Sequence, residues 1–432
     1  MNYLKKILSP SILIFSLLIF IYTFYKSEIF WDGSKRSYYI IYYVISSILF
    51  IFSLLTFFLN DKNKEYIIII FLSFVFSIYI FEGYITFKNK FPKNKFNKEQ
   101  LYEKQSGNKW DKRSRKEIYK DLKKINKKIT LSIGPANHIN KNYSIFPLAG
   151  ISNSKTIACN ENGYYSFYKS DRFGFNNPDN EWDKKKVEYL LVGDSFTHGA
   201  CVDRPHDIGS ALRKLSKKSV LNLGQGWNGP LIEYATLREY LDNNVRKVLW
   251  IYFEGNDLQD LENEIDSKIL IKYLNNLSFN QDLKNKQIEI DNILKEYVEN
   301  EKEKEFSEIY FFDFLKVSNL RILITSFLKS YSTSNFEEII YLANDFVTKK
   351  NSKLYFVYLP TYYRYSLPYF KNEYHSVKKI VNKLGIPFID IHLEVFENEK
   401  NPLNLFPFGQ FGHYNTEGYK KISNVIYELT KN

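Results

Sequence analysis

The chain has 432 residues, and its 60 lysines and arginines against 48 aspartates and glutamates give it a formal net charge of +12. Its isoelectric point is about 9.1. This balance suits nucleic acid or an anionic membrane surface, but no nucleic-acid recognition motif accompanies it, so we expect no nucleic-acid partner.

Three apolar runs open the chain and predict a membrane region over residues 1–87. Residues 7–25 and 37–60 carry no charge, and residues 66–87 contain only Glu82. Each run approaches the roughly 20 apolar residues that span a bilayer as a helix. A cleaved signal peptide is the alternative for the first run, but two more runs follow and no small-residue cleavage site is present. Glu82 is costly in a bilayer unless it lies near the interface or has a partner.

Residues 88–140 are lysine-rich and predict a basic connector, which anionic lipid headgroups would attract. Orientation stays open. The positive-inside rule groups the lysines at 5–6 with those at 62–64, and it sets the cluster at 88–98 on the other side. That count leaves the large domain cytoplasmic, although a chain that is lysine-rich throughout weakens the bias.

The remaining residues, 141–432, are enough for one large α/β domain. Its only cysteines, Cys159 and Cys201, predict either a disulfide in an oxidising compartment or two buried thiols. Two segments, 160–165 and 170–178, mix aromatic with short polar residues. That composition suits sugar binding, and ordinary turn and core use is the alternative.

A core strand is predicted to end at a serine. The apolar run 189–192 has no alternation, which is typical of a central parallel strand, and it is followed by Gly193, Asp194 and Ser195. Ligands bind at the carboxyl edge of such sheets. The alternative is a helix cap, because Asp and Ser often cap the next helix.

Two further strands end in turns rich in glycine and asparagine. Residues 220–226 run into Gly224 and Gly226, and residues 248–257 end in Gly255, Asn256 and Asp257. Beyond them, residues of about 262–345 predict a helical insertion, which would form either a lid over the site or a decoration. Residues 353–359 predict another strand, and His413 stands just before a final helix.

Serine, glycine turn, asparagine and late histidine in this order resemble the SGNH/GDSL hydrolase superfamily. Gly193, Asp194 and Ser195 match the nucleophile block, and Gly255, Asn256 and Asp257 match the asparagine block. The resemblance covers residues of about 150–432. It implies a three-layer α/β/α domain with a mostly parallel five-stranded sheet.

The resemblance also implies roles. Ser195 would be the nucleophile and His413 the base that takes its proton, since a histidine pKa near neutrality suits that task. The side-chain amide of Asn256 and the backbone N–H groups of Ser195 and Gly226 would stabilise the oxyanion.

Two positions depart from the family pattern. Trp227 stands where the glycine block expects glycine, so which backbone N–H serves there stays open. The aspartate usually found two or three residues before the histidine is replaced by Phe411 and Gln410. His413 would therefore work in a dyad, or be oriented by a backbone carbonyl or by another carboxylate, for which Asp390 is the candidate.

No metal-ligand spacing and no phosphate-binding loop is present, so we expect chemistry without a cofactor. His198 would line the pocket or lie at the surface. The sequence thus predicts a membrane-anchored serine esterase or O-acyltransferase, with acetyl groups of an envelope carbohydrate as substrate and the large domain outside. The alternative is an inactive member that binds glycan or assembly partners, which Trp227 and the missing aspartate would support.

Overall fold

The computed structural model describes residues 2–33, 36–90, 93–141, 143–300, 314–321, 333–366 and 373–432. The chain divides into two compact units. The first joins residues 1–91 with 304–328, and the second joins residues 92–303 with 329–432. The predicted insertion is therefore shared between the units, and its residues 301–313 and 322–332 lie outside the described ranges.

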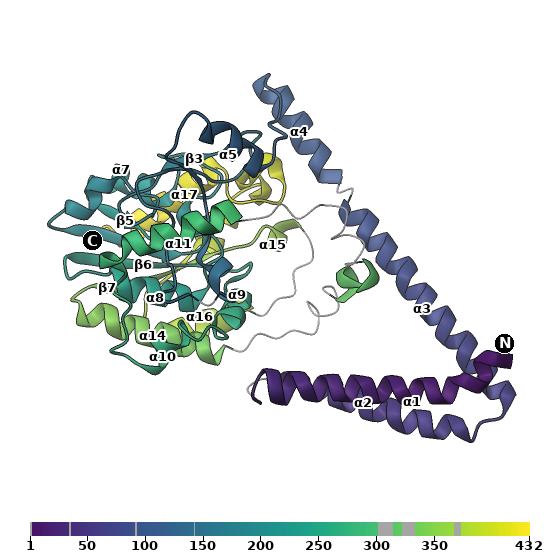
Figure 1. The fold of residues 1–432 in the computed structure, drawn as a ribbon. Helices are drawn as coiled ribbons and strands as arrows, with labels where there is room; N and C mark the ends of the chain where they lie inside the picture. Colours follow the sequence, from purple (N-terminus) through teal and green to yellow (C-terminus); the bar gives the residue numbers. More distant parts are fainter. Residues whose placement is uncertain are drawn as a thin grey trace. The chain divides into compact units, whose positions relative to one another are not determined.

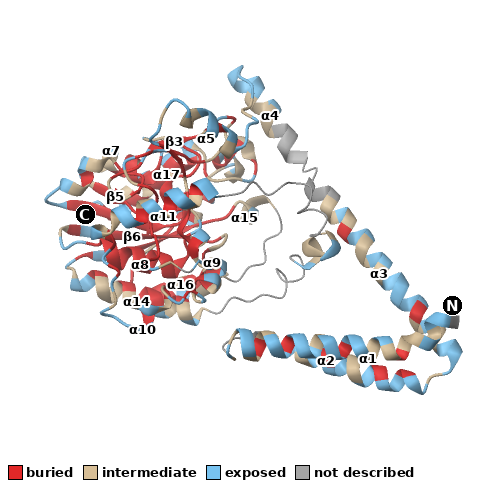
Figure 2. Ribbon diagram, in the orientation of Figure 1, coloured by how far each residue is buried: buried red, intermediate tan, exposed pale blue. Residues whose placement is uncertain are grey.

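The first unit contains the three predicted apolar helices, which are confirmed. They are α1 (Asn2–Phe24), continued by a π-helical turn Tyr25–Phe30, then α2 (Arg36–Phe57) and α3 (Asp61–Lys90). Each contains a stretch long and apolar enough to cross a membrane, namely Tyr3–Phe30, Tyr39–Phe57 and Asp61–Thr86. Many apolar residues of these helices are exposed, as a lipid environment requires, and the helices are largely in the colour of exposed residues in Figure 2.

Glu82 of α3 has a partner inside the first unit. The short segment Phe314–Arg321 turns its backbone toward the carboxylate, and the N–H groups of Asn319 and Leu320 donate to it at 3.0 and 2.8 Å. The Asn319 amide donates to Glu82 as well, at 2.9 Å, and Glu82 is fully buried. A carboxylate on an apolar helix is thereby satisfied by hydrogen bonds, which removes the objection to the third span.

The second unit is built on a five-stranded parallel sheet in the order β5-β4-β6-β7-β8 (Figure 1). The strands are β4 (Val187–Gly193), β5 (Val220–Asn222), β6 (Val245–Phe253), β7 (Lys353–Leu359) and β8 (Phe388–Asp390). Every residue of β4, an internal strand between β5 and β6, is buried. The mostly parallel sheet predicted from the sequence is confirmed.

Helices cover both faces of this sheet. Successive residues of β4 point to opposite sides: Leu191 packs in the cluster that contains α7 (Ile208–Ser216) and α17 (Thr416–Thr430), and Leu190 packs in the other. That other cluster includes α8 (Pro230–Tyr240), α14 (Ser334–Lys349) and α16 (Glu373–Lys383). The result is the three-layer α/β/α arrangement.

A second, smaller sheet was not predicted. Its order is β1-β2-β3, from β1 (Ile129–Leu131), β2 (Lys155–Ile157) and β3 (Phe167–Lys169). Within the predicted connector, α4 (Lys93–Ser106) and α5 (Arg115–Lys123) are helical, and α5 contacts β1. Among the described residues of the second unit, further helices are α6 (Ser195–His198), α9 (Asp257–Glu264), α10 (Ile271–Asn275), α11 (Gln287–Asn300) and α15 (Tyr363–Ser366). Short 3-10 or π-helical turns lie at Pro135–His138, Asp179–Asp183, Leu283–Asn285, His392–Phe396, Pro402–Leu405 and Pro407–Gly409.

Candidate active site

Ser195 lies at the carboxyl end of β4, on the first residue of α6. Asp194 caps this helix, because its side chain accepts a hydrogen bond from the N–H of Phe196 at 2.8 Å. The two sequence-based predictions for this segment, a helix cap and a serine at the sheet edge, are therefore compatible. Asp194 is the cap, and Ser195 lies at the carboxyl edge of the sheet, half-buried.

His413 comes to Ser195 from the other end of the domain. It stands just before α17, which is capped by Asn415. Its Nε2 lies 2.9 Å from Ser195 Oγ, within hydrogen-bond reach. The first and the last of the four sequence blocks thus meet, 218 residues apart along the chain.

The carboxylate that contacts His413 is Glu161, which the sequence analysis had assigned no catalytic part. Glu161 Oε1 lies 3.0 Å from His413 Nδ1, and its Oε2 accepts the backbone N–H of His413 at 2.6 Å. This approach needs Gly412, since a Cβ there would lie 2.6 Å from Glu161 Oε2. Because a carboxylate only accepts, Nδ1 carries the ring proton and Nε2 is free to accept from the serine hydroxyl.

Asp390, the carboxylate proposed from the sequence, is engaged elsewhere. Its Oδ2 accepts from Tyr374 at 2.5 Å and from Lys378 Nζ at 2.8 Å, and its Oδ1 accepts the N–H of Leu393 at 3.3 Å. It closes strand β8 and holds α16 to it. The candidate Asp390 is therefore wrong, and the carboxylate that contacts His413 is Glu161.

Burial and charge act on these groups in opposite directions. Burial lowers the pKa of His413, but the neighbouring Glu161 carboxylate outweighs it and the pKa is raised overall. Burial likewise raises the pKa of Glu161, and the charge and hydrogen bonds of His413 reverse this, so that the pKa falls below its usual value. Each partner therefore stabilises the charged form of the other.

His198 differs from His413 although both line the same cavity. It is buried, its Nδ1 lies 3.2 Å from the carbonyl of Gly224, and burial lowers its pKa to about 4. It is therefore neutral near pH 7, and its pKa is too low for a base that works there.

A disulfide joins Cys159 to Cys201, with their Cα atoms 5.0 Å apart, inside the range expected for a bridge. Cys159 is two residues before Glu161, and Cys201 is six residues after Ser195. Beside it, the Asn162 amide donates to the carbonyl of Cys201 at 2.8 Å. The bridge therefore ties the loop that carries Glu161 to the loop that follows the nucleophile.

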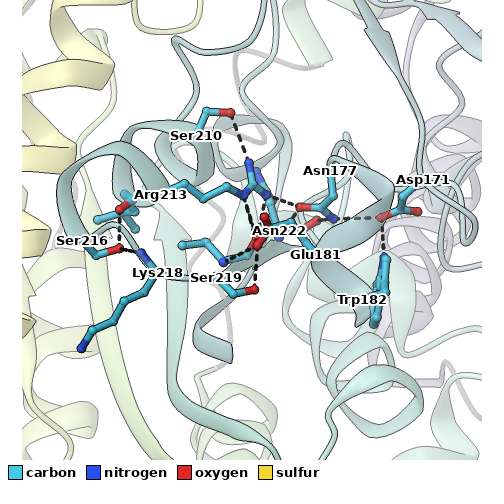
Figure 3. Close-up of polar contacts among 12 residues, drawn as sticks. Asp171, Asn177, Glu181, Trp182, Ser210, Arg213, Ser216, Lys218, Ser219 and Asn222 are labelled. Atoms are coloured by element: carbon cyan, nitrogen blue, oxygen red, sulfur yellow. Dashed lines mark hydrogen bonds and ion pairs between the residues drawn. The ribbon is translucent and has the colours of Figure 1, made fainter. Parts of the chain in front are cut away.

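A polar network holds Asn222, which begins the glycine turn that leads to Gly226 (Figure 3). Asn222 donates its backbone N–H to Asn177 Oδ1 at 2.8 Å and its side-chain amide to the carbonyl of Thr197 at 2.6 Å. Arg213 also donates to Asn177, at 2.6 Å, and Asn177 donates to the buried Asp171 at 3.0 Å. These bonds fix the turn that leads to Gly226 against the helix that follows Ser195.

Asn256 lines the same cavity as Ser195, at the end of β6. Its side-chain amide donates a short hydrogen bond to Asp260, which lies one turn further along α9. An amide nitrogen has two hydrogens, so one is used by Asp260 and the second can serve an oxyanion. Burial raises the pKa of Asp260 to about 7.

Ser195 lies on the wall of a cavity of about 460 Å³. Its walls bring together Ser195, His413, Gly226 and Asn256, the four residues singled out from the sequence. Its remaining lining comes from Arg115, Ser132, Gly134, Ala158, Cys159, His198, Ala200, Trp227, Gly255, Thr361, Tyr363 and Phe411.

One group of potential metal ligands lies at the same place. Ligand atoms of Glu161, Cys201 and His413 fall within 4.8 Å of one another. The sulfur of Cys201 is bonded to Cys159, so it is not available as a thiolate. The arrangement fits a proton relay better than a metal centre.

Sequence reasoning missed Glu161 because its partner is set by the tertiary fold. A signal was present, however. A disulfide between Cys159 and Cys201 brings the segment after Cys159 to the nucleophile loop, and Glu161 is the first carboxylate in that segment.

Comparison with known proteins gives a fold-level likeness. No family model and no curated protein matches this chain. Among solved structures, a protein assigned to the lipolytic G-D-S-L family from Desulfitobacterium hafniense is 13% identical with a TM-score of 0.32, and the match covers 56% of this chain and 99% of that one. The YxiM protein of Bacillus subtilis is 10% identical, also with a TM-score of 0.32, over 57% and 56% of the two chains.

Proposed function

We propose that this chain is a membrane-anchored serine esterase or O-acyltransferase. The observation that carries the proposal is the continuous relay from Glu161 through His413 to Ser195, with contacts of 3.0 and 2.9 Å. His413 and Ser195 line a cavity of about 460 Å³. In this proposal Glu161 takes the part of the missing aspartate, which together with Trp227 is the feature that supports the alternative of a non-catalytic protein that binds glycan or assembly partners.

The reaction follows from the geometry. Ser195 Oγ attacks the ester carbonyl carbon as its proton passes to His413 Nε2, and the new oxyanion is stabilised by the backbone N–H groups of Ser195 and Gly226 and by the amide of Asn256. When the intermediate collapses, the C–O bond to the alcohol breaks and His413 returns the proton to that oxygen. Glu161 stabilises the imidazolium that exists between these two steps.

The acyl-enzyme is then cleared by a second hydroxyl. Water, deprotonated at Nε2, yields a carboxylic acid, whereas a sugar hydroxyl yields a new ester. Both outcomes use the same residues. We propose an acylated carbohydrate of the cell envelope as substrate, since a catalytic domain tethered by three apolar helices suits a polymer made at the membrane.

We place the large domain on the outer side of the cytoplasmic membrane. The Cys159–Cys201 disulfide supports this side, because such bonds persist in oxidising compartments and are rare in the cytosol. Protease added to intact spheroplasts should digest the large domain; if it were cytoplasmic, digestion would require lysis.

The test of the activity is labelling by a fluorophosphonate probe, which reacts with an activated serine. The full chain should be labelled, and Ser195→Ala should abolish labelling. Ser278→Ala is the matched control, since Ser278 is an exposed serine of the same unit that bonds only locally. A folded protein that takes no label, or one still labelled after Ser195→Ala, would refute the assignment.

A further inference from the structure

Trp227 is unusual in both conformation and exposure. Its φ is +66°, in the left-handed region that bulky residues rarely adopt, and its side chain is 67% exposed. Backbone strain of this kind persists where the surrounding structure imposes it, and it concentrates at functional sites. Trp227 lines the cavity of Ser195 and directly follows Gly226.

The surroundings hold Trp227 in place. Gly134 passes beneath it so closely that a Cβ there would lie 2.9 Å from Trp227 Cδ1 and 2.1 Å from the carbonyl oxygen of Gly226. On the far side of the turn, the fully buried Glu264 accepts the N–H groups of Gly229 and Leu231 at 2.6 and 2.8 Å. The indole is thus presented to solvent by a backbone fixed at both ends.

Other aromatic rings border the same cavity. Phe411 and Tyr363 are 55% and 45% exposed and stack on each other with centroids 5.2 Å apart. A lipid chain would be expected to take a closed apolar tunnel, whereas open ring faces beside polar groups suit a ring with one C–H face and hydroxyl edges. Pyranose sugars have that character, because aromatic faces are electron-rich and attract C–H groups.

The charge of the cavity wall adds a second requirement. Arg115 lines the cavity and is held by a hydrogen bond of 3.0 Å from its guanidinium to the carbonyl of Ser132. Nearby, Lys98 Nζ donates to the carbonyl of Phe411 at 2.7 Å. A cation on the cavity wall, and a second held against the backbone of the wall residue Phe411, favour a substrate that carries carboxylate or phosphate groups.

We propose that Trp227, with the Phe411–Tyr363 pair, forms a sugar-stacking subsite, and that Arg115 selects an anionic polysaccharide, such as a polyuronate, as the ester-bearing substrate. This inference rests on the proposed function and deepens it. Trp227 then has a positive role: the side chain that breaks the glycine pattern is the one that contacts the polymer.

The test compares substrates on the full chain in detergent. Chemically acetylated polygalacturonate, acetylated xylan and p-nitrophenyl acetate serve as anionic, neutral and minimal substrates. Trp227→Asn is the informative variant, because asparagine tolerates the left-handed conformation but carries no ring. It should lower the ratio of kcat/KM for polygalacturonate to that for p-nitrophenyl acetate by about tenfold, through KM, whereas Trp227→Tyr should restore most of it.

Arg115→Gln should lower kcat/KM for polygalacturonate by about tenfold relative to acetylated xylan, and added salt should reduce the same difference in the unaltered protein. Tyr341→Asn is the matched control, since Tyr341 is an exposed aromatic residue, 58% accessible, on α14. Its ratios should stay within about twofold of the unaltered protein.

Binding separates this proposal from the proposed function. Deacetylated polygalacturonate should bind the Ser195→Ala protein in calorimetry, and Trp227→Asn added to it should weaken binding, whether or not the chain hydrolyses esters. Absence of both ester hydrolysis and fluorophosphonate labelling would overturn the proposed function alone. The subsite would be overturned by any of three results. These are an equal loss of kcat/KM on all three substrates in Trp227→Asn, unchanged polymer binding in that variant, or a preference of the unaltered protein for neutral over anionic polymer.

Discussion

Each unit contains a carboxylate that meets a distant segment of the chain, and the two are used differently. Glu82 on α3 binds Asn319 and Leu320, and Glu161 binds His413, over separations of 237, 238 and 252 residues. The partners of Glu82 are neutral N–H donors, so it acts as a clamp. The main partner of Glu161 is a titratable ring that contacts a serine, so we propose that Glu161 acts on a proton.

The comparison shows that a buried carboxylate is not by itself a sign of catalysis. Both accept backbone N–H groups, as buried acceptors must. What distinguishes Glu161 is that the chain of contacts continues to Ser195 and a cavity, whereas that of Glu82 runs to the amide of Asn319, which also donates to Thr86 of the same helix at 3.0 Å. Four predictions test this contrast, and they are given in order of expected effect.

The largest effect should come from Glu161→Gln. Loss of the triad carboxylate removes the group that sets the ring tautomer and stabilises the imidazolium, which costs about 10⁴-fold in rate. Hydrolysis of p-nitrophenyl acetate by the full chain measures it. Asp390→Asn is the matched control in the same unit and should retain activity, because Asp390 holds Tyr374 and Lys378. Equal losses in the two variants would remove Glu161 from the relay.

The disulfide should matter both to stability and to rate. Replacing Cys159 and Cys201 by serine frees a loop with a separation of 42 residues, which we expect to lower stability by about 2–4 kcal/mol. Because Glu161 is two residues from Cys159, misplacement of its carboxylate should also reduce the rate about 10- to 100-fold. Thermal unfolding and esterase assays measure the two effects. If the rate is unchanged while the melting temperature falls, the bridge does not position Glu161.

A smaller and purely structural effect is expected for Glu82→Ala. Without the carboxylate, the N–H groups of Asn319 and Leu320 lose their acceptor, at a cost of about 1–3 kcal/mol. This corresponds to about 5- to 160-fold more frequent opening of residues 314–321. Tryptic cleavage after Arg321 in detergent should accelerate accordingly, with esterase activity preserved.

Glu65→Ala provides the control for this measurement. Glu65 is the other glutamate of α3, and it pairs with Lys5 at 2.6 Å. Its removal should leave cleavage after Arg321 unchanged. Equal acceleration in both variants would show general loosening of α3 rather than loss of the clamp.

These carboxylates also mark how far the sequence can predict the molecule. The three apolar helices and the central strands were predicted because long apolar runs have few alternative structures. Ser195, Asn256 and His413 were found because each stands at the end of a strand or the start of a helix, where a motif is local. In the structure His413 contacts Ser195, and Asn256 lines the same cavity, while their chemical roles stay predictions.

The features that could not be predicted from the sequence depend on contacts that no local sequence pattern encodes. Glu161 lies in an irregular segment, and its distance from His413 is set by the disulfide and by the missing side chain of Gly412. The small sheet β1-β2-β3 escaped prediction because its strands have three residues each, too few to show a period. The partner of Glu82 lies in the predicted insertion, which the sequence assigned to the large domain.

The smallest effect, and the most specific to the relay, is a shift of the pH profile. His413 must be neutral at Nε2 to accept the serine proton, so kcat/KM should rise with pH through its pKa. Burial lowers that pKa, Glu161 and to a smaller extent Asp194 raise it to a net increase, and Lys98 lowers it. The acid limb of the full chain should therefore have its midpoint above the usual histidine value of about 6.5.

In Glu161→Gln the raising charge of Glu161 is gone and burial dominates, so the midpoint of the residual activity should move to lower pH. Lys98→Gln should move it to higher pH, because the opposing cation is removed. Profiles of kcat/KM for p-nitrophenyl acetate between pH 4 and pH 9 would measure both shifts, and shifts in the same direction would mean that His413 is not the titrating base.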